Sequence, residues 1–181
     1  RSDFSVSNAA NQEARTETVG VVFATTGKKY NILARRAART LKQCMPTVEI
    51  DWFTDATLKS DPVFSQIHRL SESFFRPKME ALRKSRFDRT LYLDADIITL
   101  TDVSELFTAL DDFDLLAAHA EKGQVGTPPV GEPPRCISAL NSGVIAVRKS
   151  HATDAFLLEW EREVREKKER RDQPAMRRVL A

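Results

Sequence analysis

Apolar positions along the chain alternate between a strand-like and a helix-like spacing. Residues 18–25 are a short β-branched and apolar run, which predicts a buried strand. Over residues 30–44 the apolar positions recur at helical spacing with basic residues opposite them, and Pro46 closes this predicted helix. Residues 48–52 alternate apolar with acidic positions and predict a second strand. The chain therefore opens with a strand, a helix and a strand.

The alternation of strands and helices continues to the end of the chain. The next predicted elements are a short strand near residues 68–70, a helix over residues 76–84 with Pro77 in its first turn, and a strand over residues 90–100. They are followed by a helix capped by Thr101 and Asp102 and closed by Glu105, a strand over residues 113–118, and a strand over residues 137–147 interrupted at residues 141–143. The last two are a helix with Phe156, Trp160 and Val164 facing inward and a helix from near Asp172. This order predicts an α/β fold with a mostly parallel (mixed) central sheet and helices on both faces. A ligand site is expected at the carboxyl ends of the strands.

Polar segments divide the chain only at its start. Residues 1–16 are polar and aperiodic and predict a loose lead-in, and residues 17–181 are expected to form a single domain. Residues 121–135 hold three glycines and four prolines, so they predict an exposed loop of the kind that often carries specificity. Because the chain begins at Arg1 without a methionine and stops inside a predicted helix, we expect a segment of a longer protein, truncated at its carboxyl end.

Charge and hydropathy exclude several classes of protein. The 28 basic and 26 acidic residues nearly cancel to a net charge of +2, so no global field would hold the chain to nucleic acid. No apolar run reaches the roughly 20 residues of a membrane span and no signal peptide is visible, so a cytoplasmic location is expected unless segments outside this chain anchor it. Residues 159–171 mix charges and predict a solvated helix face. Cys44 and Cys136 are expected to be free or buried thiols, with one disulfide as the alternative.

Two aspartates interrupt the apolar run of residues 90–100. Asp94 and Asp96 lie near the carboxyl end of this predicted strand, where two ionised carboxylates are unfavourable unless a cation or strong donors compensate them. Hard oxygen ligands of this kind suit Mn²⁺ or Mg²⁺, which complete their coordination with phosphate oxygens and water. We therefore predict a divalent cation that binds a diphosphate, with the alternative that both residues only cap a turn.

The motif around these aspartates resembles that of a known family. In nucleotide-sugar glycosyltransferases of the GT-A fold, especially the glycogenin and galactosyltransferase type, the metal-binding strand and its following helix look like residues 87–107 (FDRTLYLDADIITLTDVSELF). The resemblance covers residues 18–181. It implies that Asp96 binds the cation directly and that Asp94 binds the cation, the donor ribose, or both.

Two later motifs match the same family in the same order. Asn141-Ser142-Gly143 is similar to the family's Asn-x-Gly turn, which implies an amide at the donor sugar or the acceptor, with a plain β-bulge as the alternative. Asp172-Gln173 resembles the family's Asp-Gln pair, which implies that Asp172 positions hydroxyl groups and that Gln173 lies by the anomeric carbon. An N-cap role for Asp172 is the alternative. The catalytic candidates are Asn141, Asp172 and Gln173.

Weaker signals lie at the donor end. The residues after the first predicted strand lie where the family seats the nucleobase, and Tyr30 could stack on the base. Lys78 and Arg76 look like the basic pair that approaches the donor phosphates, with plain surface cations as the alternative. In all, the resemblance implies nucleotide-sugar binding by Ala24, Thr25, Thr26, Tyr30, Lys78, Asp94, Ala95 and Ser142, and metal binding by Asp94 and Asp96.

The chain departs from the family in one respect. The family often supplies a third metal ligand, a histidine, from a segment near the carboxyl end, and this chain stops before it. His119, just past a predicted strand, is the substitute candidate, whereas His68 and His151 are expected to be ordinary surface residues.

The resemblance implies metal-dependent transfer of a sugar from a nucleotide-diphosphate sugar, in the first place a UDP-sugar, to a hydroxyl on a glycan, lipid-linked or protein acceptor. The glycogenin type favours retention, whereas inversion would need one base, for which Asp172 is the first candidate. A catalytically weak sugar- or nucleotide-binding module is an alternative. A haloacid-dehalogenase-type phosphatase would want Thr or Val where Ile98 lies, and a nucleotidyltransferase would show a glycine-rich loop after the first strand.

Overall fold

A computed structural model describes residues 16–57, 60–71, 76–120, 133, 140–168 and 171–181 of the chain. The elements of this part are, in order, β1 (Val19–Thr25), α1 (Lys28–Cys44), β2 (Ile50–Thr54), β3 (Gln66–Arg69), α2 (Lys78–Lys84), β4 (Arg89–Leu93), α3 (Glu105–Ala109), β5 (Leu115–His119), β6 (Leu140–Arg148), α4 (His151–Glu166) and α5 (Gln173–Leu180). Residues 1–15 of the predicted lead-in, the predicted loop except Pro133, and Cys136 lie outside the described residues. No helix in the described ranges is long and apolar enough to cross a membrane.

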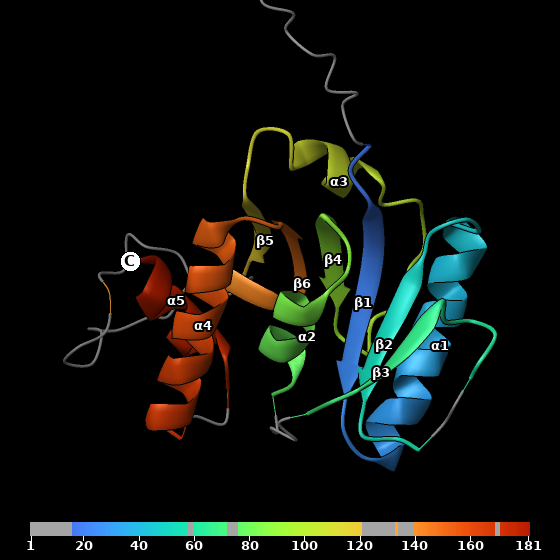
Figure 1. The fold of residues 1–181 in the computed structure, drawn as a ribbon, viewed down its shortest axis with the longest axis horizontal. Helices are drawn as coiled ribbons and strands as arrows, with labels where there is room; N and C mark the ends of the chain where they lie inside the picture. The colour runs from blue at the N-terminus through green and yellow to red at the C-terminus, as the bar shows by residue number, and fades with distance from the viewer. Residues whose placement is uncertain (1–15, 58–59, 72–75, 121–132, 134–139, 169–170) are drawn as a thin grey trace, which may run out of the picture.

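The strands form one mixed sheet in the order β3-β2-β1-β4-β6-β5 (Figure 1). β1 pairs in parallel with β2 and β4, and β2 pairs in parallel with β3. β6 runs antiparallel to both of its neighbours, β4 and β5. This arrangement confirms the predicted fold class, and it brings the carboxyl ends of β1, β2 and β4 to one edge of the sheet, the lower edge in Figure 1.

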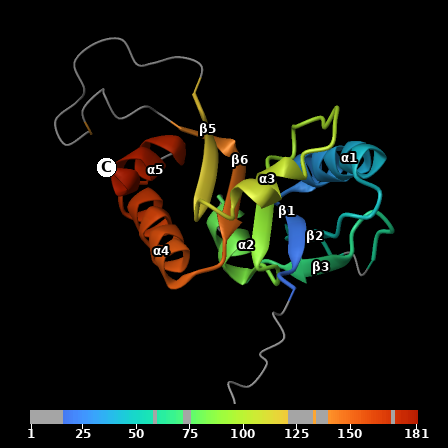
Figure 2. The ribbon, with the colours of Figure 1, turned by 90° about the horizontal axis from the view of Figure 1, so that it is seen from above.

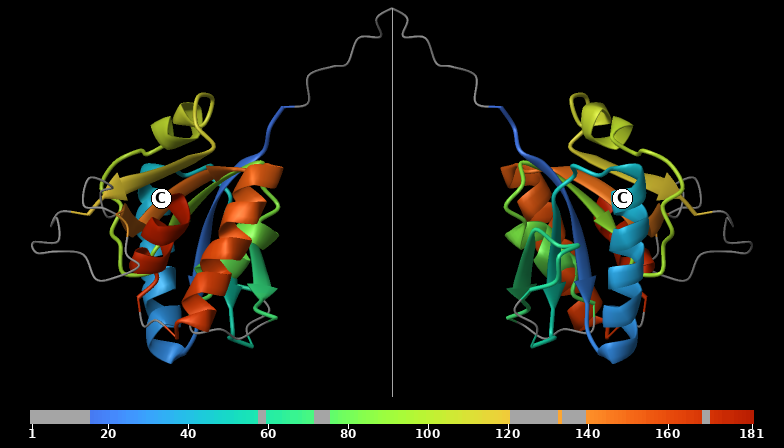
Figure 3. Two further views of the ribbon diagram at one scale, coloured as in Figure 1. Left: turned by 90° about the vertical axis from the view of Figure 1, so that its left-hand side faces the viewer. Right: turned by 90° about the vertical axis from the view of Figure 1, so that its right-hand side faces the viewer.

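Helices cover both faces of the sheet (Figures 2 and 3). Alternate residues of β1 point to opposite faces, so Val21 and Phe23 join one apolar core and Val22 joins the other. The first core is closed by α1 and α3, and the second by α2, α4 and α5. Trp52 and Trp160, one in each core, are fully buried.

The strand that carries the two aspartates is shorter than predicted. β4 ends at Leu93, and residues 94–97 form a turn in which the backbone N–H of Ile97 donates to the carbonyl of Asp94 (3.2 Å). Asp94 is half-buried and Asp96 is exposed, so the expectation of a nearly dry strand around both was wrong. Just before the turn, one more bond joins this strand to β6, from the Asp94 N–H to the carbonyl of Gly143 (2.8 Å).

Two other predicted boundaries were wrong. β6 runs without interruption through residues 141–143, which stay extended between the Leu140–His119 pair with β5 and the Gly143 carbonyl that accepts the Asp94 N–H. The ladder irregularity lies in β5, between Ala117 and His119. α3 begins only at Glu105, because Asp102 accepts the backbone N–H of Ser104 (2.7 Å) in a turn before the helix.

Buried charges account for two further differences. Asp51 on β2 is fully buried and pairs with His68 and Arg86, so His68 is not an ordinary surface residue. In the charged run of α4, Arg162 lies on a solvated face as predicted, but Glu161 is buried against α2, where it pairs with Arg83 (2.5 Å). Neighbouring elements cover positions that the local pattern alone would expose.

Candidate active site

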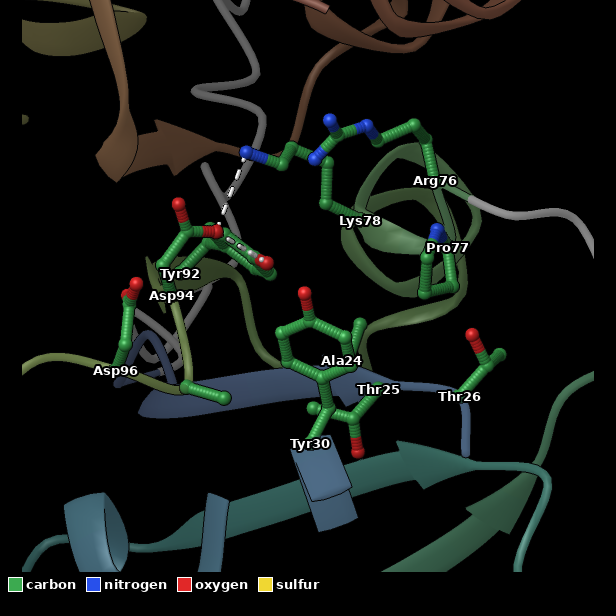
Figure 4. A pocket seen from close by; sticks show the side chains of 11 residues that line it. Ala24, Thr25, Thr26, Tyr30, Arg76, Pro77, Lys78, Tyr92, Asp94 and Asp96 are labelled. Carbon is green, nitrogen blue, oxygen red and sulfur yellow. Dashed lines mark hydrogen bonds and ion pairs between the residues drawn. The ribbon is translucent and has the colours of Figure 1, made fainter. Parts of the chain in front are cut away.

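A cavity of about 300 Å³ opens at the carboxyl ends of β1 and β4 (Figure 4). Its lining residues are Ala24, Thr25, Thr26, Tyr30, Arg76, Pro77, Lys78, Tyr92, Asp94, Ala95 and Asp96. Asp94 and Asp96 lie on one side, the basic side chains of Arg76 and Lys78 on another, and Tyr30 on a third (Figure 4). Eight of the residues expected from the sequence therefore line one cavity, together with Arg76; Pro77 and Tyr92 were not expected.

Lys78 connects Asp94, Ser142 and Asp172 in the site. It starts α2, directly after Pro77, and only 4% of its side chain is exposed. Its Nζ donates to the carbonyl oxygen of Ser142 (2.7 Å) and to Ser142 Oγ (3.1 Å), and it lies 2.9 Å from Asp172 Oδ2 and 3.3 Å from Asp94 Oδ1. The buried ammonium is thus paired and hydrogen-bonded, as a buried charge must be. It is not a plain surface cation.

The orientation of Asp94 is fixed by a neighbour on the same strand. Tyr92 Oη donates to Asp94 Oδ1 (2.8 Å), and Lys78 Nζ lies 5.0 Å from the centre of the Tyr92 ring. Burial raises the pKa of the Tyr92 phenol well above its usual value, and the negative charge of Asp94 raises this pKa further. Tyr92 therefore stays protonated and acts as a donor.

Gly143 leaves room for the carboxylate of Asp94. A Cβ atom on Gly143 would lie 3.1 Å from Asp94 Oδ2 and 3.0 Å from Asn141 Oδ1. Asn141 Oδ1 also accepts the backbone N–H of Gly143 (2.7 Å), so the side-chain amide of Asn141 lies next to Gly143 as well. Only a residue without a side chain fits here without displacing a neighbour.

Asp172 serves the site rather than the helix that it precedes. It occupies the N-cap position of α5 but makes no side-chain cap bond; it accepts a hydrogen bond from Ser142 Oγ (3.1 Å) and pairs with Lys78. Trp160 Nε1 donates to the Asp172 carbonyl (2.8 Å) and so fixes the backbone. Burial acts to raise the pKa of Asp172, but the charge and hydrogen bond of Lys78 outweigh burial and hold the pKa below its usual value. Gln173 follows as the first residue of α5 and is half-buried.

A polar network that joins β1, β2 and the first turn of α1 was not expected from the sequence. Thr25 Oγ1 donates to Asn31 Oδ1 (2.7 Å), and Asn31 Nδ2 donates to Asp55 Oδ1 (3.0 Å). Asp55 Oδ2 accepts the N–H of Gly27 (2.8 Å), whose φ of 83° favours glycine. Trp52 Nε1 donates to Thr25 Oγ1 (2.8 Å). The sequence features that could have indicated this network are Asn31 in the first turn of a predicted helix and Asp55 just after a predicted strand.

The two aspartates have the donor chemistry of a divalent-cation site. Asp96 is exposed, and in the described ranges no hydrogen bond or ion pair engages its carboxylate. Asp94 keeps Oδ2 clear of Tyr92 and Lys78, in the room left by Gly143. Such oxygens fit Mn²⁺ or Mg²⁺. His119 is exposed at the end of β5, and the described residues hold no group of three metal-ligating side chains, so the structure gathers no third ligand.

Comparison with known proteins assigns the family. A family model described as nucleotide-diphospho-sugar transferase matches residues 84–181, more than half of the chain. The chain therefore belongs to the nucleotide-diphospho-sugar transferase family, and its fold is the GT-A fold of glycosyltransferases. Among the curated proteins compared, none matches the sequence.

Solved structures with the same fold are distant in sequence. The chain is similar to apo glycosyltransferase GlyE of Streptococcus pneumoniae TIGR4, with 18% identity, a TM-score of 0.68, and coverage of 91% of this chain and 43% of that one. It is similar to galactosyltransferase LgtC in complex with donor and acceptor sugar analogs, with 20% identity, a TM-score of 0.58, and coverage of 89% and 69%. The bifunctional glycosyltransferase WbbM gives 15% identity, a TM-score of 0.60, and coverage of 92% and 38%. The chain thus spans less than half the length of GlyE and WbbM.

Proposed function

We propose that this chain is the donor-binding core of a metal-dependent glycosyltransferase, which transfers a sugar from a nucleotide-diphosphate sugar, in the first place a UDP-sugar, to a hydroxyl acceptor. The observation that carries the proposal is the cavity at the carboxyl edge of the sheet, with carboxylates on one wall and basic groups on another. A diphosphate with its cation matches that pairing, because its charges are opposite to those of each wall.

The residues at the cavity have complementary roles in this proposal. Asp94 and Asp96 hold the Mn²⁺ or Mg²⁺, which when bound stabilises the negative charge of the departing nucleoside diphosphate. Lys78 and Arg76 face the phosphates from the opposite side, and the exposed ring of Tyr30 stacks on the nucleobase. Ala24, Thr25, Thr26 and Ala95 give the remaining walls.

Asn141, Ser142, Asp172 and Gln173 are the proposed groups at the sugar. Ser142 and Asp172 contact Lys78, which lines the cavity, and Asn141 accepts the Gly143 N–H. Gln173 follows Asp172 as the first residue of α5. Asp172 is held ionised by Lys78, so it accepts hydrogen bonds from sugar or acceptor hydroxyls and orients them. Because its carboxylate is already paired, orienting hydroxyl groups fits Asp172 better than the removal of a proton from the acceptor.

Rival functions are less well supported. Family membership and fold give no support to a haloacid-dehalogenase-type phosphatase. A catalytically weak module that binds a nucleotide sugar without transferring it would share the whole cavity. Hydrolysis of the donor separates such a binding module from a glycosyltransferase, because a binding module would release no free sugar.

Calorimetric titration of UDP tests the donor site. We expect binding with Mn²⁺ present, much weaker binding without it, and loss of the metal-dependent part in Asp96→Ala. Asp112→Ala is the matched control, since Asp112 is an exposed aspartate after α3 that does not line the cavity. If UDP, GDP and dTDP all fail to bind with metal present, or if Asp96→Ala binds like the parent chain, the proposal is wrong.

A further inference from the structure

The exposed side of α1 is a cationic surface that the proposed reaction does not use. Its basic residues are Lys28, Lys29, Arg35, Arg36, Arg39 and Lys42, and the helix has no acidic residue. The whole chain has a net charge of only +2, so this single helix is more positive than the entire chain. The helix is therefore a local concentration of positive charge.

Helix stability does not explain these charges. Lys28 and Lys29 lie in the first turn, where the helix dipole is positive and the helix itself has no acidic residue; the carboxylate at this end is Asp55, which bonds to Gly27 and Asn31. Arg35 and Arg39 lie four positions apart, and like charges at that spacing repel each other. Apolar contacts of Ala34, Ala37, Ala38 and Leu41 with the sheet hold the helix in place despite this.

Among the described residues, Arg35 and Lys42 are the basic residues of α1 with ion-pair or hydrogen-bond partners, and Lys29 Nζ lies 5.8 Å from the centre of the neighbouring Tyr30 ring. Arg35 pairs with Asp61 (3.2 Å), and Lys42 Nζ donates to the carbonyls of Pro46 (3.2 Å) and Val48 (2.7 Å). The other four, Lys28, Lys29, Arg36 and Arg39, are exposed, and no ion pair to any of them is formed within the part of the chain that the structure covers. Helix α4 differs, since Arg162, Arg165 and Lys167 each pair with a glutamate.

Exposed aliphatic side chains border these cations. Ile32 on α1 is 56% exposed and shares the helix side of Arg36 and Lys29. The segment after the turn of residues 94–97 runs along α1 (Figure 2). The Thr99 N–H donates to Thr40 Oγ1 (3.2 Å), and Thr40 lies one helical turn after Arg36.

The residues on either side of Thr99 extend the same surface. Ile98 is 52% exposed and Leu100 is 87% exposed, so both aliphatic side chains face solvent beside the cationic stripe. Isolated exposed aliphatic residues are common, but here three of them adjoin unpaired cations. The combination of positive charge and aliphatic groups is typical of surfaces that bind the polar–apolar boundary of a bilayer.

We infer that this α1 surface, made of Lys28, Lys29, Ile32, Arg36, Arg39, Ile98 and Leu100, docks on an anionic lipid bilayer. The lipid headgroups supply the negative charge that the helix lacks, and the aliphatic side chains enter the headgroup boundary. The stripe from Lys28 to Arg39 is about 16 Å long, which exceeds one diphosphate and favours an extended partner. A soluble polyanion would match the charges but leave Ile98 and Leu100 in water.

The location of the cavity gives this docking a consequence. Tyr30, in the first turn of α1, lines the candidate active site, so the cavity opens next to one end of the α1 surface. A bilayer bound there lies beside the cavity and brings membrane-linked acceptors close to it. The docking itself does not depend on glycosyl transfer and can be measured without a donor.

Cosedimentation with vesicles tests the inference. The chain is mixed with vesicles of phosphatidylcholine alone and of phosphatidylcholine with about one-third phosphatidylserine. We expect binding to the anionic vesicles only, weakening as salt rises. Since one basic residue near such a surface strengthens binding about five-fold, Arg36→Glu/Arg39→Glu should weaken it at least about 30-fold. Leu100→Ser should weaken binding several-fold without a change in net charge.

The matched control is Lys167→Glu/Lys168→Glu at the end of α4, which changes net charge equally and lies on another element. It should bind anionic vesicles like the parent chain, and UDP titration checks that all variants keep the donor site. Absence of binding to anionic vesicles at low salt would overturn the inference. An equal loss in the control pair would also overturn it, as would tight binding to soluble heparin with no effect of Leu100→Ser, which would indicate a polyanion partner instead.

Discussion

Nζ of Lys78 lies 2.9 Å from Oδ2 of Asp172, and both side chains are almost fully buried. This pair joins the first turn of α2 to the residue before α5. An isolated buried charge is strongly unfavourable, so each partner depends on the other. The pair therefore couples the stability of the fold to the integrity of the candidate active site.

Removal of one partner of this pair should destabilise the protein. Lys78→Met keeps the volume of the side chain but leaves Asp172 buried without its cation, and we expect a loss of about 3–5 kcal/mol in the free energy of unfolding. Urea denaturation measures it. The double variant Lys78→Met/Asp172→Asn should recover part of the loss; if its loss equals the sum of the two single losses, the two residues are not coupled.

The same pair gives stability a dependence on acid pH. Because the folded-state pKa of Asp172 lies below its usual value, its carboxylate contributes stability that is complete above the ordinary aspartate pKa of about 4. That contribution is lost as pH falls through the lower folded-state pKa. The difference in stability between the parent chain and Asp172→Asn should therefore be constant near neutral pH and shrink below about pH 4. A constant difference down to pH 2 would contradict the shifted pKa.

Tyr92 should matter for cation binding although it does not contact the proposed cation. Tyr92→Phe removes the donor that orients Asp94 Oδ1 while keeping the buried ring. Loss of such an orienting partner typically weakens metal affinity about 10–100-fold, which a titration of Mn²⁺ in the presence of UDP would measure. Tyr30→Phe is the control, because it also removes one hydroxyl at the cavity but none that bonds to Asp94. Equal effects of both variants would refute an orienting role.

Two glycine substitutions should separate binding from stability. Gly143→Ala places a methyl group against Asp94 Oδ2 and should reduce metal-dependent UDP binding more than stability. Gly20→Ala places a methyl group 2.2 Å from the Phe87 ring, away from the cavity, and should cost about 1–3 kcal/mol of stability through overpacking. Calorimetry and urea denaturation on both variants check the contrast. A Gly143→Ala chain with unchanged nucleotide binding would be evidence against the crowding of Asp94.

Sequence pattern predicted the order of strands and helices because each core face leaves a regular apolar period, as in β1 and α1. It failed where the outcome depends on partners distant in the chain. Asp51 looked like one polar position in an alternating strand, yet Arg86 and His68 allow it to be fully buried. The strand before Asp94 ends at Leu93, and its last bond to β6, from the Asp94 N–H to the Gly143 carbonyl, joins residues that are far apart in the sequence.

The candidate site was predictable in its residue types but not in its connections. The cavity collects Asp94, Asp96 and Tyr30 as the motifs suggested, since they follow strands that end at one edge. Nothing local to Lys78 signals that its ammonium bonds to Ser142 and Asp172. Those contacts bring together residues of α2, β6 and the start of α5 in the tertiary structure, which no short motif encodes.

The contacts of Lys78 also bear on how the chain folds during synthesis. Its partners Ser142 and Asp172 lie far after it in the sequence and are translated later. Until α5 docks, the ammonium lacks the carboxylate of Asp172 and has only Ser142 and Asp94 as partners. The burial of this ammonium is therefore complete only when α5 has docked, and Trp160 fluorescence is a natural reporter of that step because its indole N–H donates to the Asp172 carbonyl.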